Sequence, residues 1–146
     1  MSNMVELSWQ SQRALPFNTQ GQGLHEIMRD VISLIESRPI ATGLLTIYCR
    51  HTSASLIIQE NADPAVLEGL QHFFKQLVSE GGLSYEHAAE GPDDIPALIQ
   101  GTPTATCLSI PVSVGSLSLG VWQGNFLFEH RLQPHTCEVI LHLMGA

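Results

Sequence analysis

The sequence predicts an α+β fold in which strands dominate and two helices are inserted early in the chain. Three observations favour this class. Apolar and polar residues alternate near both ends of the chain, and apolar residues recur every three or four positions in two early segments. The regular strand–helix alternation of a doubly wound fold does not occur in the sequence. We expect β-rich, sandwich-like antiparallel or mixed sheets with two main helices.

The first helix is expected between strands in the N-terminal half. Residues 5–10 alternate as in a half-buried strand, and a polar turn follows at 18–23. Apolar residues then recur at three and four positions over 24–38, which predicts a helix that packs on the core. Two segments rich in β-branched and large apolar residues, 43–48 and 54–58, are expected to form strands.

The second helix has a clear start signal. Asp63 can accept hydrogen bonds from the free amides of a first turn, and Pro64 suits the first helical position, where its missing N–H costs nothing. Phe73 and Phe74 lie on the apolar stripe that follows, and we expect both to anchor the helix in the core. The glycines at 81–82 predict its end.

The C-terminal half is expected to be a run of antiparallel strands. Before it, residues 85–101 are polar and contain prolines, which predicts an irregular stretch with a single helical turn at 94–100. The strands are predicted at 106–112, 116–122, 125–129 and 136–143.

Length and composition limit the classes of function. A chain of 146 residues is expected to form one domain over residues 1–146. Charged residues make up only 14%, against roughly 25% in an average soluble protein, so we expect part of the surface to be covered by another subunit. Six Lys+Arg against fourteen Asp+Glu give a net charge of −8, which argues against nucleic-acid binding.

Cysteine usage and the absence of targeting signals predict a cytoplasmic protein. Cys49, Cys107 and Cys137 are widely spaced and form no CxxC pair, so we expect all three to be small apolar core residues in a reducing compartment. The N-terminus lacks the pattern of a secretory signal. No segment has the ~18–20 consecutive apolar residues of a membrane span, so we expect no membrane partner.

Polar groups capable of chemistry concentrate in three places at strand ends or in loops. These clusters are Arg50–Ser53 leading to Glu60 and Asn61, Tyr85–His87 leading to Asp93 and Asp94, and Trp122–Gln123 leading to Glu129, His130 and Arg131. Any single cluster also fits a turn, a cap or a solvated strand end. Three histidines brought together would suit a metal such as zinc, or one could serve as an acid–base group. No local metal-ligand spacing such as HExxH supports the metal.

The same clusters resemble the motifs of a known family. The resemblance rests on HTSAS at 51–55, QENADP at 59–64, YEH at 85–87 with EGPDDIPA at 90–97, and GVWQG at 120–124 with EHR at 129–131. In this order and spacing, covering nearly the whole chain, they are similar to the YjbQ-like family. The resemblance implies a β-rich α+β fold assembled as a homotrimer. It also implies a weak thiamine-phosphate synthase activity, in which a pyrimidine diphosphate joins a thiazole phosphate and pyrophosphate is released.

Most of the family's polar pattern is present, but one short segment departs from it. The matching positions are His51, Glu60, Asn61, His87, Asp94, Trp122, Gln123, Glu129 and His130. Where the family has a histidine and a lysine, this chain has Leu98 and Gln100. Leucine offers neither a lone pair nor an exchangeable proton, and glutamine cannot balance a phosphate charge as an ammonium does. The departures therefore predict attenuated or altered activity.

We accordingly expect a site between subunits of a trimer that takes a small anionic or phosphorylated metabolite. His51, His87 and His130 would gather around a divalent metal, zinc or magnesium, or around the substrate. The catalytic set is completed by Glu60, Glu129 and Asp94, and the substrate-binding set comprises Arg50, Ser53, Asn61, Trp122, Gln123 and Arg131. Glu129 or Glu60 would orient an imidazole, and Trp122 would form an apolar wall against a heteroaromatic ring. The alternative is a non-catalytic trimer that binds a small anion or a metal.

Overall fold

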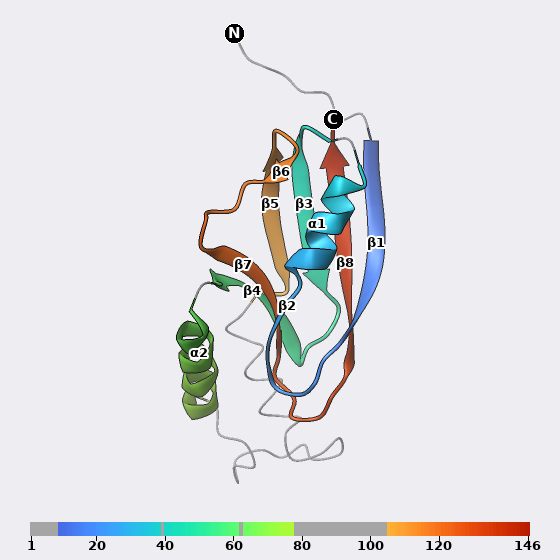
Figure 1. The fold of residues 1–146 in the computed structure, drawn as a ribbon. Coiled ribbons are helices and arrows are strands. Elements are labelled where there is room, and N and C mark those ends of the chain that lie inside the picture. The colour runs from blue at the N-terminus through green and yellow to red at the C-terminus, as the bar shows by residue number, and fades with distance from the viewer. Residues whose placement is uncertain (1–8, 39, 62, 78–104) are drawn as a thin grey trace.

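The computed structural model describes residues 9–38, 40–61, 63–77 and 105–146, which form two antiparallel sheets and two helices (Figure 1). One sheet has five strands in the order β1-β8-β3-β5-β6, and the other has three in the order β2-β7-β4. The elements are β1 (Trp9–Asn18), β2 (Gly23–Glu26), α1 (Met28–Glu36), β3 (Thr42–Cys49), β4 (Ala54–Glu60), α2 (Pro64–Leu77), β5 (Cys107–Ser113), β6 (Ser116–Leu117), β7 (Gln123–Glu129) and β8 (Thr136–Gly145). The predicted α+β class with two helices is confirmed.

The main core lies on the inner face of the five-stranded sheet. Alternate residues of β8, from Cys137 to Leu143, are buried there, as period-2 side-chain alternation requires. Helix α1 lies across this face in front of β3 and β8 (Figure 1) and buries Val31, Leu34 and Ile35. The three-stranded sheet contributes Leu56 and Leu127 to the same cluster. The inward face of β4 and β7 therefore points at the larger sheet.

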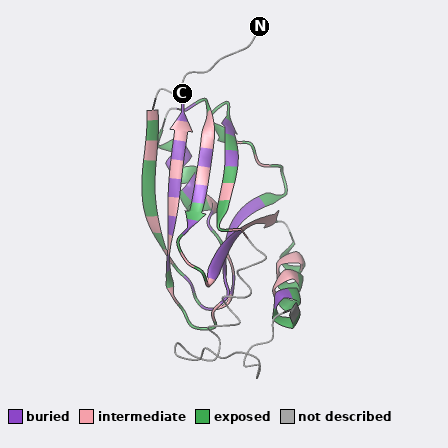
Figure 2. Cartoon of the chain, turned by 180° about the vertical axis from the view of Figure 1, so that it is seen from behind, coloured by how far each residue is buried: buried purple, intermediate pink, exposed green. Residues whose placement is uncertain are grey.

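The opposite face of the five-stranded sheet has no described helix over it, as the view from behind shows (Figure 2). Register and alternation place on it Gln10, Gln12 and Ala14 of β1, Ile140, His142 and Met144 of β8, Leu44, Thr46 and Tyr48 of β3, and Cys107, Ser109 and Pro111 of β5. We call this set the outer sheet face. By the same alternation Glu138 of β8 also lies on this side of the sheet, next to the set, and forms an ion pair with Arg50. The set itself contains no Asp, Glu, Lys or Arg, and several of its side chains are large and apolar.

Helix α2 begins as predicted. The Asp63 carboxylate accepts a hydrogen bond from the Ala65 N–H at 2.9 Å, which is the expected cap. Phe74 is buried and packs edge-on against Phe128, with ring centroids 5.2 Å apart. The prediction for Phe73 is wrong, because its side chain is 55% exposed. Adjacent helical residues point about 100° apart, so when Phe74 faces the small sheet, Phe73 turns away from it.

Tertiary pairing changes the predicted element boundaries. Residues 23–26 form β2 instead of the start of a helix, because they pair with β7 over 126–129, and α1 begins only at Met28. Strand β1 continues to Asn18, and its position at the sheet edge tolerates Pro16. The predicted strand at 116–122 is limited to β6.

Two further expectations concern exposure. Cys107 is exposed on β5, so the expectation of a core role is wrong for this cysteine, whereas Cys49 and Cys137 are buried as predicted. Cys107 lies on the outward-facing side of β5, whereas Ile110 and Val112 lie on its inward-facing side and are buried. No helix among the described residues is long and apolar enough to cross a membrane. The predicted irregular stretch at 85–101 lies outside the described residues.

Candidate functional site

The predicted site residues lie at opposite ends of the β4–β7 ladder. These strands pair antiparallel, with Ala54 opposite Glu129 at one end and Glu60 opposite Gln123 at the other. Six residue steps separate the two ends, which corresponds to roughly 20 Å of extended strand. We call the end that holds Ser53, Ser55, Glu129 and His130 the buried end. The end that holds Glu60, Asn61, Trp122 and Gln123 is the open end.

Glu129 is the central carboxylate of the buried end. It is buried, and its oxygens accept hydrogen bonds from the Thr19 hydroxyl (3.1 Å), the Cys137 thiol (3.2 Å) and the Arg131 backbone N–H (3.1 Å). An ionised carboxylate can only accept, so three donors from three segments suit it well. Its hydrogen-bond partners among the described residues do not include an imidazole, and the expectation that Glu129 or Glu60 orients one stays a prediction. The carboxylate instead joins β7 to β8 between the sheets.

The two buried cysteines are held as thiols. Burial raises the pKa of Cys137, and the neighbouring Glu129 carboxylate and its hydrogen bond raise it further. Burial also raises the pKa of Cys49, whose Sγ lies 3.6 Å from the Ala54 carbonyl oxygen. A thiol is a poor nucleophile and a poor metal ligand, since both roles require the thiolate. The buried end therefore uses its cysteines for packing and hydrogen bonding.

His130 lies on the other side of β7 from Glu129 and is completely buried. Its Nε2 is 2.9 Å from the Ser55 hydroxyl, and its ring centroid is 4.3 Å from that of Phe128 and 6.3 Å from that of Phe74. Burial lowers the pKa of His130 to about 4, so the ring is neutral near pH 7. Its Nδ1 is buried without a hydrogen-bond partner. The ring is uncharged and fully buried within the single chain, so it offers a ligand no positive charge.

His51 and Arg50 are both bound to Glu138 of β8. The His51 Nε2 accepts the Glu138 backbone N–H at 3.0 Å, which places the proton of the neutral ring on Nδ1. The Arg50 guanidinium forms an ion pair with the Glu138 carboxylate. His51 is half-buried and fixed in orientation by this contact, so within this chain its free nitrogen is a hydrogen-bond donor.

The metal-binding prediction has no support from the described residues of one chain. In this part of the chain, no three His, Cys, Asp or Glu side chains are grouped so that they could hold a metal ion. Both described histidines of the predicted set use Nε2 in a hydrogen bond, His51 with a backbone amide and His130 with Ser55. The remaining ligand, His87, and the predicted catalytic Asp94 lie outside the described residues. The convergence of three imidazoles stays a prediction.

The open end does bring its predicted residues together. Glu60, Trp122 and Gln123, with Ile58 and Gln59, line a hollow of about 330 Å³. Trp122 is 63% exposed, so its ring is accessible to a ligand. No Lys or Arg is among these lining residues. The open end therefore offers an aromatic surface and a carboxylate, but no cation of its own.

Backbone contacts hold the open end in place. The Asn61 N–H donates to the Trp122 carbonyl oxygen at 3.1 Å, and the Gly120 N–H donates to the Gln123 side-chain oxygen at 2.8 Å. A Cβ on Gly124 would lie 3.0 Å from the Asn61 Cβ, so glycine permits this close approach of the two chain segments. Asn61 is exposed and is tied to the open end by this backbone hydrogen bond; it does not line the hollow.

Three buried polar residues, Thr19, Ser55 and Asn125, were not singled out by their sequence pattern. Thr19 donates to Glu129 although the two lie 110 positions apart, and nothing local marks it. Ser55 stands inside the quoted motif at 51–55 and contacts His130. Asn125 is fully buried on β7, and neither of its side-chain amide atoms has a hydrogen-bond partner. A polar residue within a run of buried apolar residues is the signal that could have found it.

Arg131 and Ser53 complete the buried end. The Arg131 Nη1 lies 3.4 Å from the His135 Nε2, and the Ser53 carbonyl oxygen accepts the His130 N–H at 3.1 Å. Ser53 is thus present through its backbone, and Arg131 contacts the Glu129 carboxylate through its backbone N–H.

Comparison with known proteins agrees with this architecture. The sequence pattern described as UPF0047 protein YjbQ-like matches residues 13–146. UPF0047 protein sll1880 from Synechocystis is 51% identical over 136 residues, covering 93% of this chain and 92% of that protein. UPF0047 protein YjbQ from Escherichia coli O157:H7 is 36% identical over 135 residues, covering 92% and 97%.

Solved structures share the fold. A crystal structure of a YbjQ-like protein of unknown function from Sulfolobus solfataricus has a TM-score of 0.81 at 19% identity, covering 94% of this chain and 100% of that one. The conserved hypothetical protein TT1486 from Thermus thermophilus has a TM-score of 0.77 at 29% identity, covering 88% and 97%. With the matching pattern over nearly the whole chain, the protein belongs to the YjbQ-like UPF0047 family.

Proposed function

We propose that the chain assembles with copies of itself so that the open end of one subunit faces the buried end of a neighbour, and that a phosphorylated heteroaromatic metabolite binds between them. The observation that carries this proposal is the separation of roughly 20 Å between the two groups of polar residues within one chain. A small metabolite cannot touch Trp122 and His130 of the same subunit across that length.

The outer sheet face supports self-association. Its residues are uncharged and include Leu44, Tyr48, Ile140 and Met144, in a protein that carries a net charge of −8. Depletion of charge with enrichment of aromatic residues and Met is typical of the core of a protein–protein interface. A face without unpaired charge can be buried against a different face of a neighbouring copy, as a cyclic trimer requires. The homotrimer expected from the family resemblance is the proposed assembly.

The proposed reaction is the joining of hydroxymethylpyrimidine diphosphate to thiazole phosphate. The thiazole nitrogen forms a bond to the pyrimidine methylene carbon, the carbon–oxygen bond breaks, and its electron pair leaves on pyrophosphate. Trp122 at the open end would stack on a heteroaromatic ring. The charge that develops on the departing oxygens needs a cation, and Arg131 at the neighbour's buried end would supply it.

His130 would act as a neutral hydrogen-bonding group in this scheme. Its Nδ1 is unpartnered, and its lowered pKa keeps the ring uncharged. Leu98 and Gln100 replace the histidine and lysine that the family resemblance expects, so we propose that turnover is slow.

A second candidate function is non-catalytic binding of a small anion or of a divalent metal such as zinc or magnesium. It is favoured by the buried end, where Glu129 and His51 already have hydrogen-bond partners within the chain. Side chains that already have hydrogen-bond partners within the chain are suited to stabilising the fold and are less available to act on a substrate. Metal analysis of the purified protein and anion titration in the absence of the second substrate address this candidate.

The proposed reaction is tested by measuring thiamine phosphate formation from the two substrates. Trp122→Ala should reduce the rate at least tenfold, while Val121→Ala, a change at the neighbouring exposed residue, should leave it unchanged. Equal rates in both variants would contradict the role of the open end. Activity that appears only after Leu98→His would mean that the natural chain has lost the reaction, which favours the binding function.

A mixing experiment tests the shared site. Trp122→Ala damages only the open end and His130→Ala only the buried end. When the two inactive variants are unfolded together and refolded, some interfaces regain one intact end from each subunit, and activity should return. Mixtures that stay as inactive as the separate variants would show that each site is built from one subunit.

A further inference from the structure

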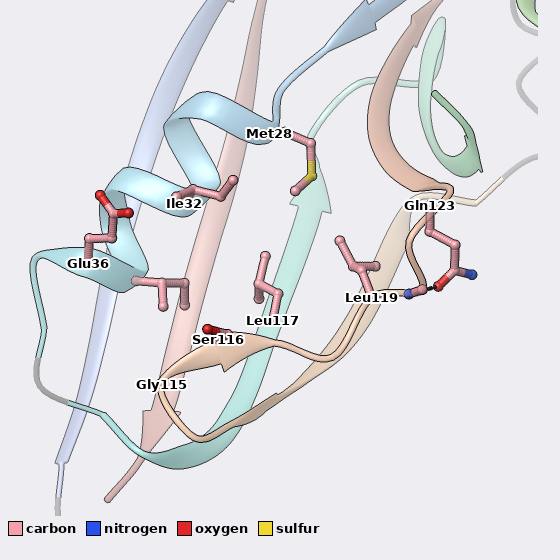
Figure 3. Close-up of a pocket in the computed structure, with 10 residues that line it drawn as sticks. Met28, Ile32, Glu36, Gly115, Ser116, Leu117, Leu119 and Gln123 are labelled. Atoms are coloured by element: carbon pink, nitrogen blue, oxygen red, sulfur yellow. Dashed lines mark hydrogen bonds between the residues drawn. The ribbon is translucent and has the colours of Figure 1, made fainter. Parts of the chain in front are cut away.

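A second hollow lies between α1 and the chain segment that follows β5 (Figure 3). Its volume is about 340 Å³, which falls within the range of small-molecule sites. Its apolar walls are Met28, Ile32 and Ile35 of α1 and Leu117 and Leu119 on the opposite side, and its polar lining residues are Glu36, Ser116 and Gln123. We call this hollow the α1 groove.

The α1 groove is elongated because of helix geometry. Met28, Ile32 and Glu36 are spaced four residues apart, so they form one stripe along α1. Eight residues at 1.5 Å rise span roughly 12 Å. Met28 and Gln123 lie near one end of the groove and Glu36 lies at the other (Figure 3). An occupant with an extended apolar body of about six carbons fits this length.

The Glu36 end of the groove is negative. Glu36 is the only Asp, Glu, Lys, Arg or His among the lining residues, and it forms no ion pair with any described residue. It also stands at the last position of α1, where helix carbonyl groups carry partial negative charge. A cation is therefore favoured at this end, and a carboxylate or phosphate is disfavoured.

We propose that the α1 groove binds a small amphiphilic amine, with its apolar body between α1 and Leu117 and its protonated nitrogen at Glu36. The α1 groove adjoins the open end and shares Gln123 with it, but it would take a cation, whereas the proposed reaction takes an anionic metabolite. Charge complementarity sets the class of ligand, because Glu36 is the one charged side chain lining a groove whose other lining residues are apolar or neutral. A second copy of the chain covering the half-exposed Ile32 is the competing occupant.

The test compares three probes of equal length and different charge: hexylammonium, hexan-1-ol and hexanoate. Each is titrated into the full chain at pH 7, and binding is followed by amide NMR shifts. Hexylammonium should bind about three- to fivefold tighter than hexanol, the ratio expected of one partly exposed ion pair, and hexanoate should bind weakest. The shifts should concentrate at the amides of α1 and of residues 115–119.

Two variants decide whether Glu36 and the groove are responsible. Glu36→Gln should remove the preference for hexylammonium over hexanol, while the control Glu68→Gln, on the exposed side of α2, should retain it. Leu117→Trp should fill the groove and weaken all three probes, and its fold is checked by the unchanged NMR shifts of β8. Equal affinity for the three probes, or shifts that spread outside the groove, would overturn the proposal.

Protein concentration provides the remaining check. If a second copy covers the groove, the amides of α1 and of residues 115–119 should shift on dilution without any probe, and Ile32→Ser should abolish that dependence. Such a result would assign the groove to self-association and overturn the amine site. Concentration-independent shifts together with the ammonium preference would support it.

Discussion

The buried end and the open end of the β4–β7 ladder use similar residue types for different purposes. Glu129 and His130 at one end are buried and in contact with hydrogen-bonding or aromatic neighbours from β4, α2, β8 and Thr19, which follows β1. Glu60 and Trp122 at the other end face a hollow and are accessible. An acid beside a histidine in the sequence therefore does not by itself indicate a working pair. The burial of each side chain, and the face of the strand to which it points, decide whether it can contact a ligand.

The largest expected effect comes from removing the buried carboxylate. Glu129→Ala leaves the Cys137 thiol and the Arg131 N–H without their acceptor and removes one of the two acceptors near the Thr19 hydroxyl, so the free energy of unfolding should fall by about 4 kcal/mol. Glu60→Ala at the open end should change it by less than about 0.5 kcal/mol. Urea unfolding measures both. Similar losses at the two ends would contradict the comparison.

The next effect is a pH dependence set by His130. The pKa of His130 is about 4 in the folded chain and about 6.5 when unfolded, so the unfolded state binds more protons between these values. Stability is therefore fully present above pH 6.5 and is lost as the pH falls toward 4, by at most about 3 kcal/mol. His130→Phe should flatten this part of the urea-midpoint profile, whereas His72→Gln, a change of an exposed histidine, should preserve it.

A smaller effect of opposite sign is expected inside β7. Both amide atoms of Asn125 are buried without a partner, so Asn125→Leu should raise the free energy of unfolding by about 1 kcal/mol. Ser55→Ala is the matched change, because its hydroxyl does have a partner in His130, and it should cost about 1 kcal/mol. A destabilised Asn125→Leu would reveal a partner for the amide, such as a buried water.

The smallest effect concerns thiol reactivity. In the folded chain Cys107 should react with a maleimide far faster than Cys49 and Cys137, because only Cys107 is exposed. Glu129→Ala should increase labelling of Cys137 by loosening the buried end, and mass spectrometry after short exposure identifies the modified residue. If the outer sheet face is covered in the assembly, Cys107 labelling should slow as protein concentration rises.

Local patterns were enough to predict several elements. The Asp63 cap and Pro64 start of α2 depend on neighbours in sequence, and the alternation of β8 depends only on its own residues. Residues 23–26 could not be assigned in this way, because their strand exists through pairing with β7 more than a hundred positions away. The exposure of Phe73 beside the buried Phe74 likewise depends on which face of α2 meets Phe128.

The candidate site shows the same division. Apart from Ser55 and Thr19, the polar residues of the open and buried ends were identifiable as candidates from the motifs at strand ends, and the family followed from the order of those motifs. The division of these residues between the two ends of the ladder could not be predicted, because it depends on the antiparallel register, which places Glu60 beside Gln123 and far from Glu129. The opposite directions of the Glu129 and His130 side chains have a related cause, since adjacent residues of an extended strand point to opposite faces.

The sequence by itself determined the α+β class, the two helices, the C-terminal strands, the family and the set of candidate polar residues, because periodicity, capping and motif order are local properties of the chain. Only the tertiary structure decided which of those residues are accessible and which are buried partners of Thr19, Ser55 and Glu138. The physical reason is that burial and hydrogen-bond geometry arise from contacts between distant segments, which no local pattern encodes.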